Sequence, residues 1–481
     1  MSNTTQALSR IEAILDDSSF VEIGARVTAR ATDFNMQEKK APSDGVITGY
    51  GVVNGNLVYV YSQDASVLGG TIGEMHAKKI ASLYEKAMKM GAPVVGLIDC
   101  AGLRLQEATD ALNGFGEIYK NMSLASGIIP QITAVYGECG GGLAVLAELS
   151  DFVFVEEKKA KLFVNSPNAL DGNYESKLDT SSAKFMAEAG VVDFVGDEET
   201  IANGVRQLVS MLPSNNAEGT VCTDNKDDLN RVCQDMEAEI ADPALALTDI
   251  SDDGVFVEAK AEYAKEMVTG FILVDGVTVG AVANRTSLYD ENGEKAEEFA
   301  PVLTTAGAYK AAEFVTFCNA FEIPVLTLTN VKGFEATVKS ERTIAKAAAK
   351  LVYAFSNADV PKVNIITGEA YGSAYVAMNS KSIGADMVYA WPQASIGMMD
   401  ASLAAKIMYA DDIAASKDVT STINEKAAEY AALQSSVDQA AARGYVDTII
   451  NPEDTRKYVA AAFEMLFDKR EVRADKKHGT V

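Results

Sequence analysis

Two glycine-rich turns carry the residues in this sequence that could do chemistry without a reactive side chain. One runs from Gly137 to Gly142 and the other from Gly368 to Ala374, and each directly follows a short apolar run. Glycine permits positive φ and close approach of the backbone, and the start of a following helix leaves N–H groups unpaired. Two such amides can hold the oxyanion of an enolate or of a tetrahedral intermediate. The turns therefore predict backbone oxyanion sites, with tight packing of a helix on a sheet as the alternative.

The sequence contains few residues for other kinds of catalysis. The sequence has 2 histidines, His76 and His478, which argues against a Ser-His-Asp triad, a Cys-His dyad and a site with several histidine ligands. His76 lies in a helical pattern, so we expect a packing or surface role. The 5 cysteines never form a Cys-x-x-Cys pair, which argues against a zinc knuckle and favours a reduced compartment. Neither turn continues into Gly-Lys-Ser/Thr, so neither is a P-loop.

Two further patterns predict no site. Residues 87–90 read Ala-Met-Lys-Met, the signature of a biotin-accepting lysine, with Lys89 as the acceptor. That signature works on a protruding hairpin, whereas here it ends a helix whose end we expect to be buried. The acidic pairs Asp227-Asp228 and Asp252-Asp253 are expected to be solvated linker and not a metal site.

An internal repeat organises the chain. Residues 90–104 align without a gap with residues 321–335, and residues 129–143 align with residues 360–374 at the same offset of 231. Chance matches between glycines are common, but an unbroken register over about 50 residues is not. The chain is therefore predicted to consist of two homologous halves.

Both halves predict the same order of elements. Each starts with a hairpin, at 49–62 or 270–283, whose Asn-Gly or Asp-Gly turn favours type I′. A helix follows, at 73–91 or 301–321, and then a short apolar run, a second helix, a second apolar run and the glycine-rich turn. Short apolar runs that alternate with helices indicate buried strands, so we predict an α/β layered fold.

The polar segment 213–250 separates the halves, which we place at residues 1–228 and 229–481. The alanine-rich stretch 400–443 is predicted to be helical. With 42 Lys and Arg against 68 Asp and Glu, the net charge is −26, which makes a nucleic-acid partner improbable. The sequence has neither a long apolar run that could span a membrane nor the apolar core of a signal peptide near its start, so we expect a cytoplasmic protein.

The chain resembles the carboxyltransferase subunits of biotin-dependent acyl-CoA carboxylases and decarboxylases. These include the propionyl-CoA carboxylase β chain and the methylmalonyl-CoA decarboxylase α chain. The segments that carry the resemblance are 62–80, 102–132, 137–155, 369–400, 443–456 and 469–479. The resemblance covers nearly the whole chain. It implies two homologous crotonase-like halves of ββα-superhelix type, in agreement with the repeat.

The resemblance also implies a mechanism that needs no histidine. Carboxybiotin on a carrier protein releases CO2, the decarboxylated biotin takes the α-proton of an acyl-CoA, and the carboxyl group is transferred to that carbon. Gly141 and Gly142 of the first half would hold the thioester oxygen of the acyl-CoA. Ser373 and Ala374 of the second half would hold the ureido oxygen of biotin. No metal is implied in this subunit.

The sequence departs from the family pattern at several positions. Residues Gly372–Val376 read Gly-Ser-Ala-Tyr-Val where the family usually has Gly-Gly-Ala-Tyr-Asp. Ser373 keeps the backbone amide, whereas Val376 replaces an acid that is associated with the choice of acyl chain. Residues 332–334 and 101–104 also differ, from Pro-Gly-Phe and from Gly-Gly-Ala-Arg. The chemistry is therefore predicted and the acyl group is left open.

Three functions remain open at this point. The first is a carboxyltransferase that works with a biotin carboxyl carrier protein and a biotin carboxylase. The second is the same subunit in a membrane sodium-pumping decarboxylase complex, and the third is a non-catalytic structural paralogue. Because the family builds each site from two subunits, a homo-oligomer is expected, from a dimer to a hexamer.

Overall fold

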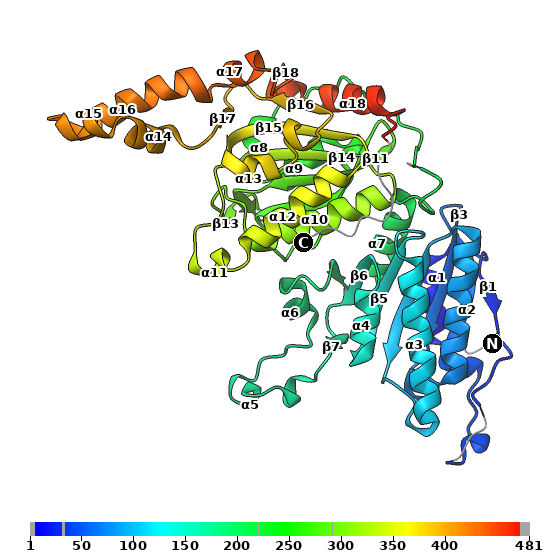
Figure 1. The fold of residues 1–481 in the computed structure, drawn as a ribbon. Helices are drawn as coiled ribbons and strands as arrows, with labels where there is room; N and C mark the ends of the chain where they lie inside the picture. The colour runs from blue at the N-terminus through cyan, green and yellow to red at the C-terminus, as the bar shows by residue number, and fades with distance from the viewer. Residues whose placement is uncertain (1–4, 31–33, 220, 291, 472–481) are drawn as a thin grey trace. The chain divides into compact units, whose positions relative to one another are not determined.

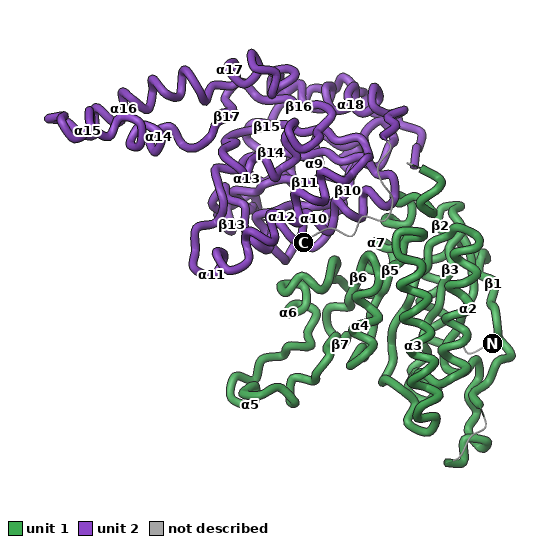
Figure 2. The backbone as a smooth tube through the Cα atoms, viewed as in Figure 1, with its two compact units in different colours: residues 1–219 green, residues 220–481 purple. Residues whose placement is uncertain are grey.

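The computed structural model describes residues 5–30, 34–219, 221–290 and 292–471. His478 and the last residues of the 469–479 segment lie outside these ranges. The chain divides into two compact units, residues 1–219 and 220–481 (Figure 2). The finer expectation, an acyl-CoA half that ends at 228 and a biotin half that begins at 229, stays a prediction.

In the described part of the first unit, eight strands form one sheet, in the order β1-β2-β3-β4-β5-β6-β8 with β7 beside β5 (Figure 1). The strands are β1 (Val21–Ile23), β2 (Val46–Val53), β3 (Asn56–Gln63), β4 (Val94–Cys100), β5 (Gln131–Gly140), β6 (Phe152–Glu156), β7 (Lys161–Phe163) and β8 (Phe194–Gly196). β1, β2 and β3 pair antiparallel, and the pairs from β3 onward are parallel.

The described part of the second unit repeats this sheet, in the order β9-β10-β11-β14-β15-β16-β18 with β17 beside β15. Its strands are β9 (Phe256–Ala259), β10 (Met267–Val274), β11 (Val277–Asn284), β14 (Val325–Val331), β15 (Lys362–Tyr371), β16 (Met387–Ala390), β17 (Ser395–Gly397) and β18 (Thr448–Ile449). A separate hairpin of β12 (Ser287–Tyr289) and β13 (Lys295–Glu298) has no counterpart among the described strands of the first unit.

The repeat is visible in the registers of the sheets. Val94 lies opposite Gln131 in the first unit, and Val325 lies opposite Lys362 in the second, each 231 residues later. A β-bulge interrupts both pairings, between Ile98 and Cys100 and 231 residues later between Thr329 and Val331. The prediction of two homologous halves is therefore confirmed at the level of single residues.

Helices cover both sheets (Figure 1). The first unit contains α1 (Gln6–Ile14), α2 (Glu74–Met90), α3 (Ala108–Ala125), α4 (Gly142–Glu148), α5 (Asn173–Ser176), α6 (Ala183–Glu188) and α7 (Glu198–Met211). The second contains α8 (Met236–Glu239), α9 (Pro243–Ile250), α10 (Thr305–Ala320), α11 (Val338–Glu341), α12 (Ile344–Asn357), α13 (Gly372–Ala377), α14 (Ala401–Met408), α15 (Ala410–Ala415), α16 (Val419–Tyr430), α17 (Val437–Ala442) and α18 (Thr455–Leu466).

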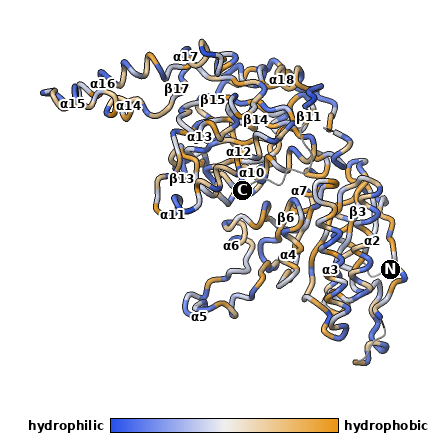
Figure 3. The backbone as a smooth tube through the Cα atoms, in the orientation of Figure 1, coloured by the Kyte–Doolittle hydropathy of each residue, from blue (hydrophilic) through white to orange (hydrophobic). Residues whose placement is uncertain are grey.

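The packing follows from the sequence pattern. Hydrophobic and hydrophilic residues alternate along α2 and α3 (Figure 3), and their apolar faces bury Ile80, Ile118 and Met122 against Ile98 and Val135 of the sheet. In the second unit, residues of α9 and α18 share a buried cluster with alternate residues of β10 and β11. This alternation is what the period of two in a strand requires when a sheet is covered by helices.

The local predictions for turns and helices are confirmed. Asn54 and Gly55 have φ of 49° and 84°, and Asp275 and Gly276 have φ of 53° and 70°, so both central residues of each hairpin turn are left-handed as type I′ requires. The alanine-rich region is helical, and α14, α15 and α16 extend from the body of the second unit as an arm (Figure 1). In the described residues no helix combines the length and apolarity that crossing a membrane requires.

One prediction about the linker is wrong. Asp252 was expected in solvent but is 3% exposed, and its carboxylate accepts a hydrogen bond from Arg456 at 2.6 Å. Asp227 also pairs with Arg456, at 3.1 Å, whereas Asp253 is exposed. The prediction that Asp252 lies in solvent failed because the arginine that pairs with it is more than 200 residues away, in α18.

Candidate active site

The first glycine-rich turn joins β5 to α4. Gly141 has φ 64° and ψ −126°, a conformation that only glycine adopts without strain, and its N–H donates to the carbonyl of Phe163 in β7 at 2.8 Å. Gly142 is the first residue of α4. Because the first N–H groups of a helix have no partner within it, the Gly142 amide is available to a ligand, whereas the Gly141 amide is already paired.

Aromatic side chains hold Gly142 in place. The hydroxyl of Tyr119 in α3 donates to the Gly142 carbonyl at 2.5 Å, and Phe115 packs edge-on against Tyr119 with ring centroids 5.0 Å apart. A Cβ built on Gly142 would lie 2.7 Å from Phe115 and 2.8 Å from the Tyr119 oxygen. The position therefore requires glycine because of these neighbours and not because of its φ.

The second turn joins β15 to α13. Gly372, with φ 62°, is the residue 231 positions after Gly141, so the two turns make the same left-handed step. Ser373 is exposed and Ala374 is buried, and both lie in the first turn of α13, where amides lack helical partners. Val376 is half-buried one turn further along. Ser373 has an ordinary φ, so the change from the family's glycine costs no backbone strain at that position.

The sequence analysis did not predict a second backbone amide in each unit. Leu103 follows β4 and forms a parallel bridge with Ile72, in which the flanking residues Gly102 and Arg104 make both hydrogen bonds. The N–H of Leu103 itself therefore takes no part in the bonds to Ile72 and points away from that residue. The bridge between Leu303 and Phe334 repeats this geometry in the second unit. The sequence signal for these two amides was the pair of motifs at 101–104 and 332–334, which differ from the family pattern.

The side chains near the first turn are poor acids and bases. Burial raises the pKa of Tyr119 above its ordinary value, and burial also raises the pKa of the Cys139 thiol far above its usual range. Cys139 lies two residues before Gly141, yet it stays protonated and unreactive. Across the described residues, no group of three or more His, Cys, Asp or Glu side chains is placed to hold a metal ion.

His76 and Lys89 lie apart from the turns. His76 is fully buried in α2, as a packing role predicts. Lys89 ends the same helix and is exposed, so the expectation of a buried helix end is wrong at this residue. Its backbone is nevertheless helical and not part of a hairpin.

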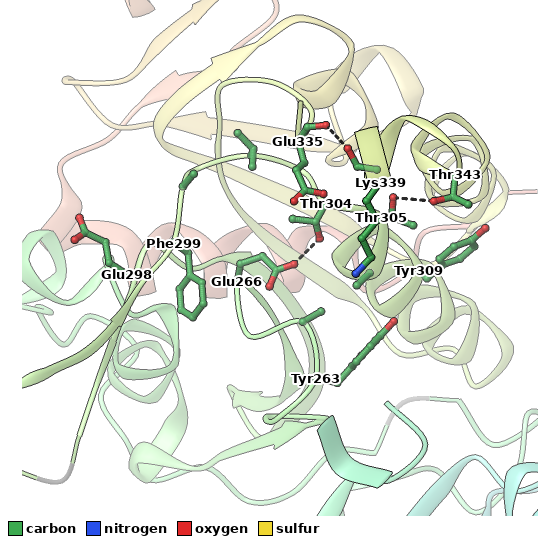
Figure 4. Close-up of a pocket in the computed structure, with 15 residues that line it drawn as sticks. Tyr263, Glu266, Glu298, Phe299, Thr304, Thr305, Tyr309, Glu335, Lys339 and Thr343 are labelled. Atoms are coloured by element: carbon green, nitrogen blue, oxygen red, sulfur yellow. Dashed lines mark hydrogen bonds between the residues drawn. The ribbon is translucent and has the colours of Figure 1, made fainter. Parts of the chain in front are cut away.

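A pocket of about 600 Å³ opens in the second unit at the start of α10 (Figure 4). Its wall includes Glu335, which directly follows Phe334, together with Glu266, Glu298 and Lys339. The Thr304 hydroxyl donates to Glu266 beside this pocket. Three carboxylates against one ammonium make the wall acidic, which disfavours phosphate groups.

The comparison with known proteins decides the family. The carboxyl transferase domain family matches residues 2–481. This chain belongs to the carboxyl transferase family. The resemblance inferred from the sequence segments is therefore confirmed, and so is the predicted class of enzyme.

Individual relatives agree along the whole chain. The carboxyl transferase is 39% identical to methylmalonyl-CoA decarboxylase subunit alpha of Propionigenium modestum, covering 99% of this chain and 92% of that protein. It is 38% identical to the propionyl-CoA carboxylase beta chain of Roseobacter denitrificans, covering 99% and 93%.

A solved structure confirms the fold class. A crystal structure of transcarboxylase 12S, described as a hexamer with hydrolysed methylmalonyl-coenzyme A bound, matches with a TM-score of 0.91 and 35% identity. The match covers 98% of this chain and 92% of that one. The α/β fold with two crotonase-like halves is therefore the fold of this carboxyl transferase.

Proposed function

We propose that this carboxyl transferase moves a carboxyl group between carboxybiotin on a separate carrier protein and the α-carbon of a short-chain acyl-CoA. The observation that carries the proposal is the pair of equivalent turns, at Gly141 and Gly372, each of which leads into the amides at the start of a helix. A reaction with two developing oxyanions and a base that arrives with the substrate is the chemistry that such a pair serves.

On the acyl-CoA side, the Gly142 amide is the main donor to the thioester oxygen. The amide of Leu103 is a second candidate donor, since it takes no part in the bridge to Ile72, and Gly141 contributes the left-handed step that leads into Gly142. Negative charge develops on the thioester oxygen when the α-proton leaves. Preorganised amides stabilise that charge more in the transition state than in the ground state.

On the biotin side, the amides of Ser373 and Ala374, with Phe334 as the matching second donor, fit a ureido oxygen, which accepts hydrogen bonds only. Bound carboxybiotin supplies the carboxyl group and, after its loss, the base. Gly372 and Val376 flank this site, and Val376 makes its wall more apolar than an acid would.

The distribution of charge supports the same assignment of the two units. Arg30 pairs with Glu74 and Asp110 at the starts of α2 and α3 in the first unit. The exposed cations Arg26, Lys39 and Lys40 lie on the same segment before β2. Coenzyme A carries phosphates, and a basic segment in an otherwise acidic protein favours them.

The test is a transfer assay with the full chain and free carboxybiotin, run in parallel with acetyl-, propionyl-, butyryl-, malonyl- and glutaconyl-CoA. We expect a carboxylated product from at least one of the saturated short-chain substrates. Absence of transfer with all of them, while acyl-CoA still binds, would identify a non-catalytic paralogue.

The physiological direction is tested by the reverse reaction. The similarity to a methylmalonyl-CoA decarboxylase subunit makes a decarboxylase complex the second candidate. With methylmalonyl-CoA and free biotin, a decarboxylase subunit should release propionyl-CoA faster than it carboxylates propionyl-CoA with free carboxybiotin.

The proposal includes a homo-oligomer in the cytoplasm that works with a biotin carboxyl carrier protein. Each chain offers one acyl-CoA turn and one biotin turn. In the family each site is built from two subunits, so the first unit of one copy would face the second unit of another, and the transcarboxylase 12S structure is described as a hexamer. Light scattering at micromolar concentration should give at least a dimer. An active monomer would contradict this part of the proposal.

A further inference from the structure

In both units, a polar side chain lies across the β-bulge that precedes the glycine-rich turn. These side chains are Asp99 in β4 and Asn330 in β14, which are 231 residues apart. Each bulge interrupts the regular pairing just before the last residues of β5 or β15. A bulge redirects the strand that carries it, so whatever fixes the bulge fixes the direction of the turn.

Asn330 makes two hydrogen bonds at the second bulge. Its side-chain Oδ1 accepts from the backbone N–H of Glu369 at 3.0 Å. Its backbone N–H donates to the side-chain Oδ1 of Asn284, at the end of β11, also at 3.0 Å. A Cβ on Gly368 would lie 2.7 Å from the same Asn330 oxygen, so glycine makes room for this side chain. Glu369 begins the three-residue pairing with β17 that ends next to Gly372.

Asp99 occupies the equivalent position with different chemistry. Its N–H donates to Oε1 of Gln63, at the end of β3, at 3.3 Å. A Cβ on Gly137 would lie 2.1 Å from Asp99 Oδ1. The other carboxylate oxygen accepts from Nη1 of Arg10 in α1 at 2.9 Å. The Asp99 carboxylate therefore lies against Gly137 beside the first bulge and is held there by an ion pair to α1, whereas the Asn330 amide bonds the backbone of the second bulged strand directly.

We propose that Asn330 and Asp99 are positioning residues for the transfer reaction, each of which fixes the bulge that aims the amide turn of its own unit. The inference rests on the proposed function of those turns. The hydrogen bond to the Glu369 N–H sets the last strand residues before Gly372 and, through them, the amides of Ser373 and Ala374. A displacement of such donors by about 1 Å costs on the order of 100-fold in rate.

The test is Asn330→Ala in the full chain, assayed with free carboxybiotin and the preferred acyl-CoA. We expect kcat to fall about 100-fold while the Kd of acyl-CoA, measured by titration calorimetry, stays within threefold, because the acyl-CoA turn lies in the other unit. Asn330→Asp keeps the acceptor oxygen and the volume, and should restore kcat to within tenfold of the wild type. Asn330→Ser, which is too short to reach Glu369, should resemble the alanine variant and serves if that variant does not fold.

Asn319→Ala is the matched control. Asn319 is a half-buried asparagine near the end of α10, and its Oδ1 accepts from the backbone N–H of Asp359 at 2.8 Å, the same kind of bond that Asn330 makes to Glu369. It should lower the melting temperature as much as Asn330→Ala does but leave kcat within threefold. Equal loss of kcat in both variants, or full activity in folded Asn330→Ala and Asn330→Ser, would overturn the positioning role. A wild-type chain that transfers nothing would instead overturn the proposed function, and the positioning role with it.

Discussion

Arg456 and Asp252 form a buried ion pair at 2.6 Å, although 204 residues separate them in the sequence. The Arg456 side chain is fully buried, and it also donates to the carbonyl of Ile250. Asp252 accepts from the N–H of Gly276 as well, at 2.7 Å. The pair thus joins α18, the segment after α9 and the β10–β11 turn.

Removal of the Asp252 carboxylate should destabilise the second unit strongly. Asp252→Ala removes the nearer of the two carboxylates that pair with a buried guanidinium, and breaking a buried ion pair typically costs about 3–5 kcal/mol in the free energy of unfolding. Urea unfolding followed by circular dichroism measures this. Asp253→Asn, next to it but exposed, should change the value by less than about 0.5 kcal/mol. Similar effects of the two variants would contradict the role of the ion pair.

His76 should make the stability of the first unit depend on pH. Burial lowers the pKa of His76 from 6.5 to about 3, and the charges of Arg104 and Lys79 act in the same direction. The folded protein therefore keeps His76 neutral, whereas the unfolded chain takes up a proton below pH 6.5. Stability that is present above pH 6.5 is lost as the pH falls toward 3, and the loss amounts to about 2 kcal/mol at pH 5.

The control for this effect is His76→Asn, which cannot titrate. In the wild type, the ring Nδ1–H donates to the carbonyl of Asp44 at 2.9 Å, so Nε2 accepts from the Gln63 amide at 3.2 Å. The asparagine variant should be less stable at pH 7 but should lose less stability between pH 7 and pH 5. Parallel curves for the two proteins would show that His76 is not the titrating group.

Gly142→Val should reduce transfer while leaving the protein folded. The added side chain meets Phe115 and Tyr119 and displaces the start of α4, and with it the donor amide. We expect activity to fall about 10²–10³-fold with a smaller change in acyl-CoA affinity. Gly116→Ala in α3, where a Cβ meets nothing within 4 Å, is the control. A folded Gly142→Val variant with near-normal turnover would reduce the glycine to a packing role.

Ala374→Val should affect the other substrate. Ala374 is 1% exposed, so a larger side chain must shift the first turn of α13. Acyl-CoA binding should be unchanged, and the KM for free carboxybiotin should rise or kcat should fall. Steady-state kinetics with each substrate varied in turn separates this result from a loss on the acyl-CoA side.

Purified protein should carry no biotin at Lys89. The side chain is exposed, but it ends α2, and a biotin ligase acts on a protruding hairpin. Intact mass measured after co-expression with a biotin ligase should equal the mass of the unmodified chain. A biotin adduct that disappears in Lys89→Arg would prove the prediction wrong.

Much of the fold could be predicted because it is local or repeated. The hairpin turns at Asn54-Gly55 and Asp275-Gly276 follow from residue types that tolerate positive φ. The offset of 231 gave the equivalent strands, since β14 and β15 have the bounds of β4 and β5 shifted by that number. The β12–β13 hairpin was missed because it lies outside the repeated segments and has an exposed, charged second strand.

The candidate site was predictable as a pair of turns but not as a set of donors. Which amide is free depends on pairing with a distant strand, and the bond from the Gly141 N–H to Phe163 in β7 is not visible in the motif. The amides of Leu103 and Phe334 emerge only from the sheet order. The roles of Asp99 and Asn330 likewise depend on which residue of the next strand stands across the bulge.

The β12–β13 hairpin offers a practical handle on the second unit. The β10–β11 hairpin repeats the first unit at an offset of 221, whereas β14 and β15 repeat it at 231, and the extra residues lie between β11 and α10, where this hairpin is found. Its strands pair only with each other in the described residues, and every residue of β13 is exposed. A fluorophore attached at Lys295 would therefore label this unit while its eight-stranded sheet and its amide turn remain as they are.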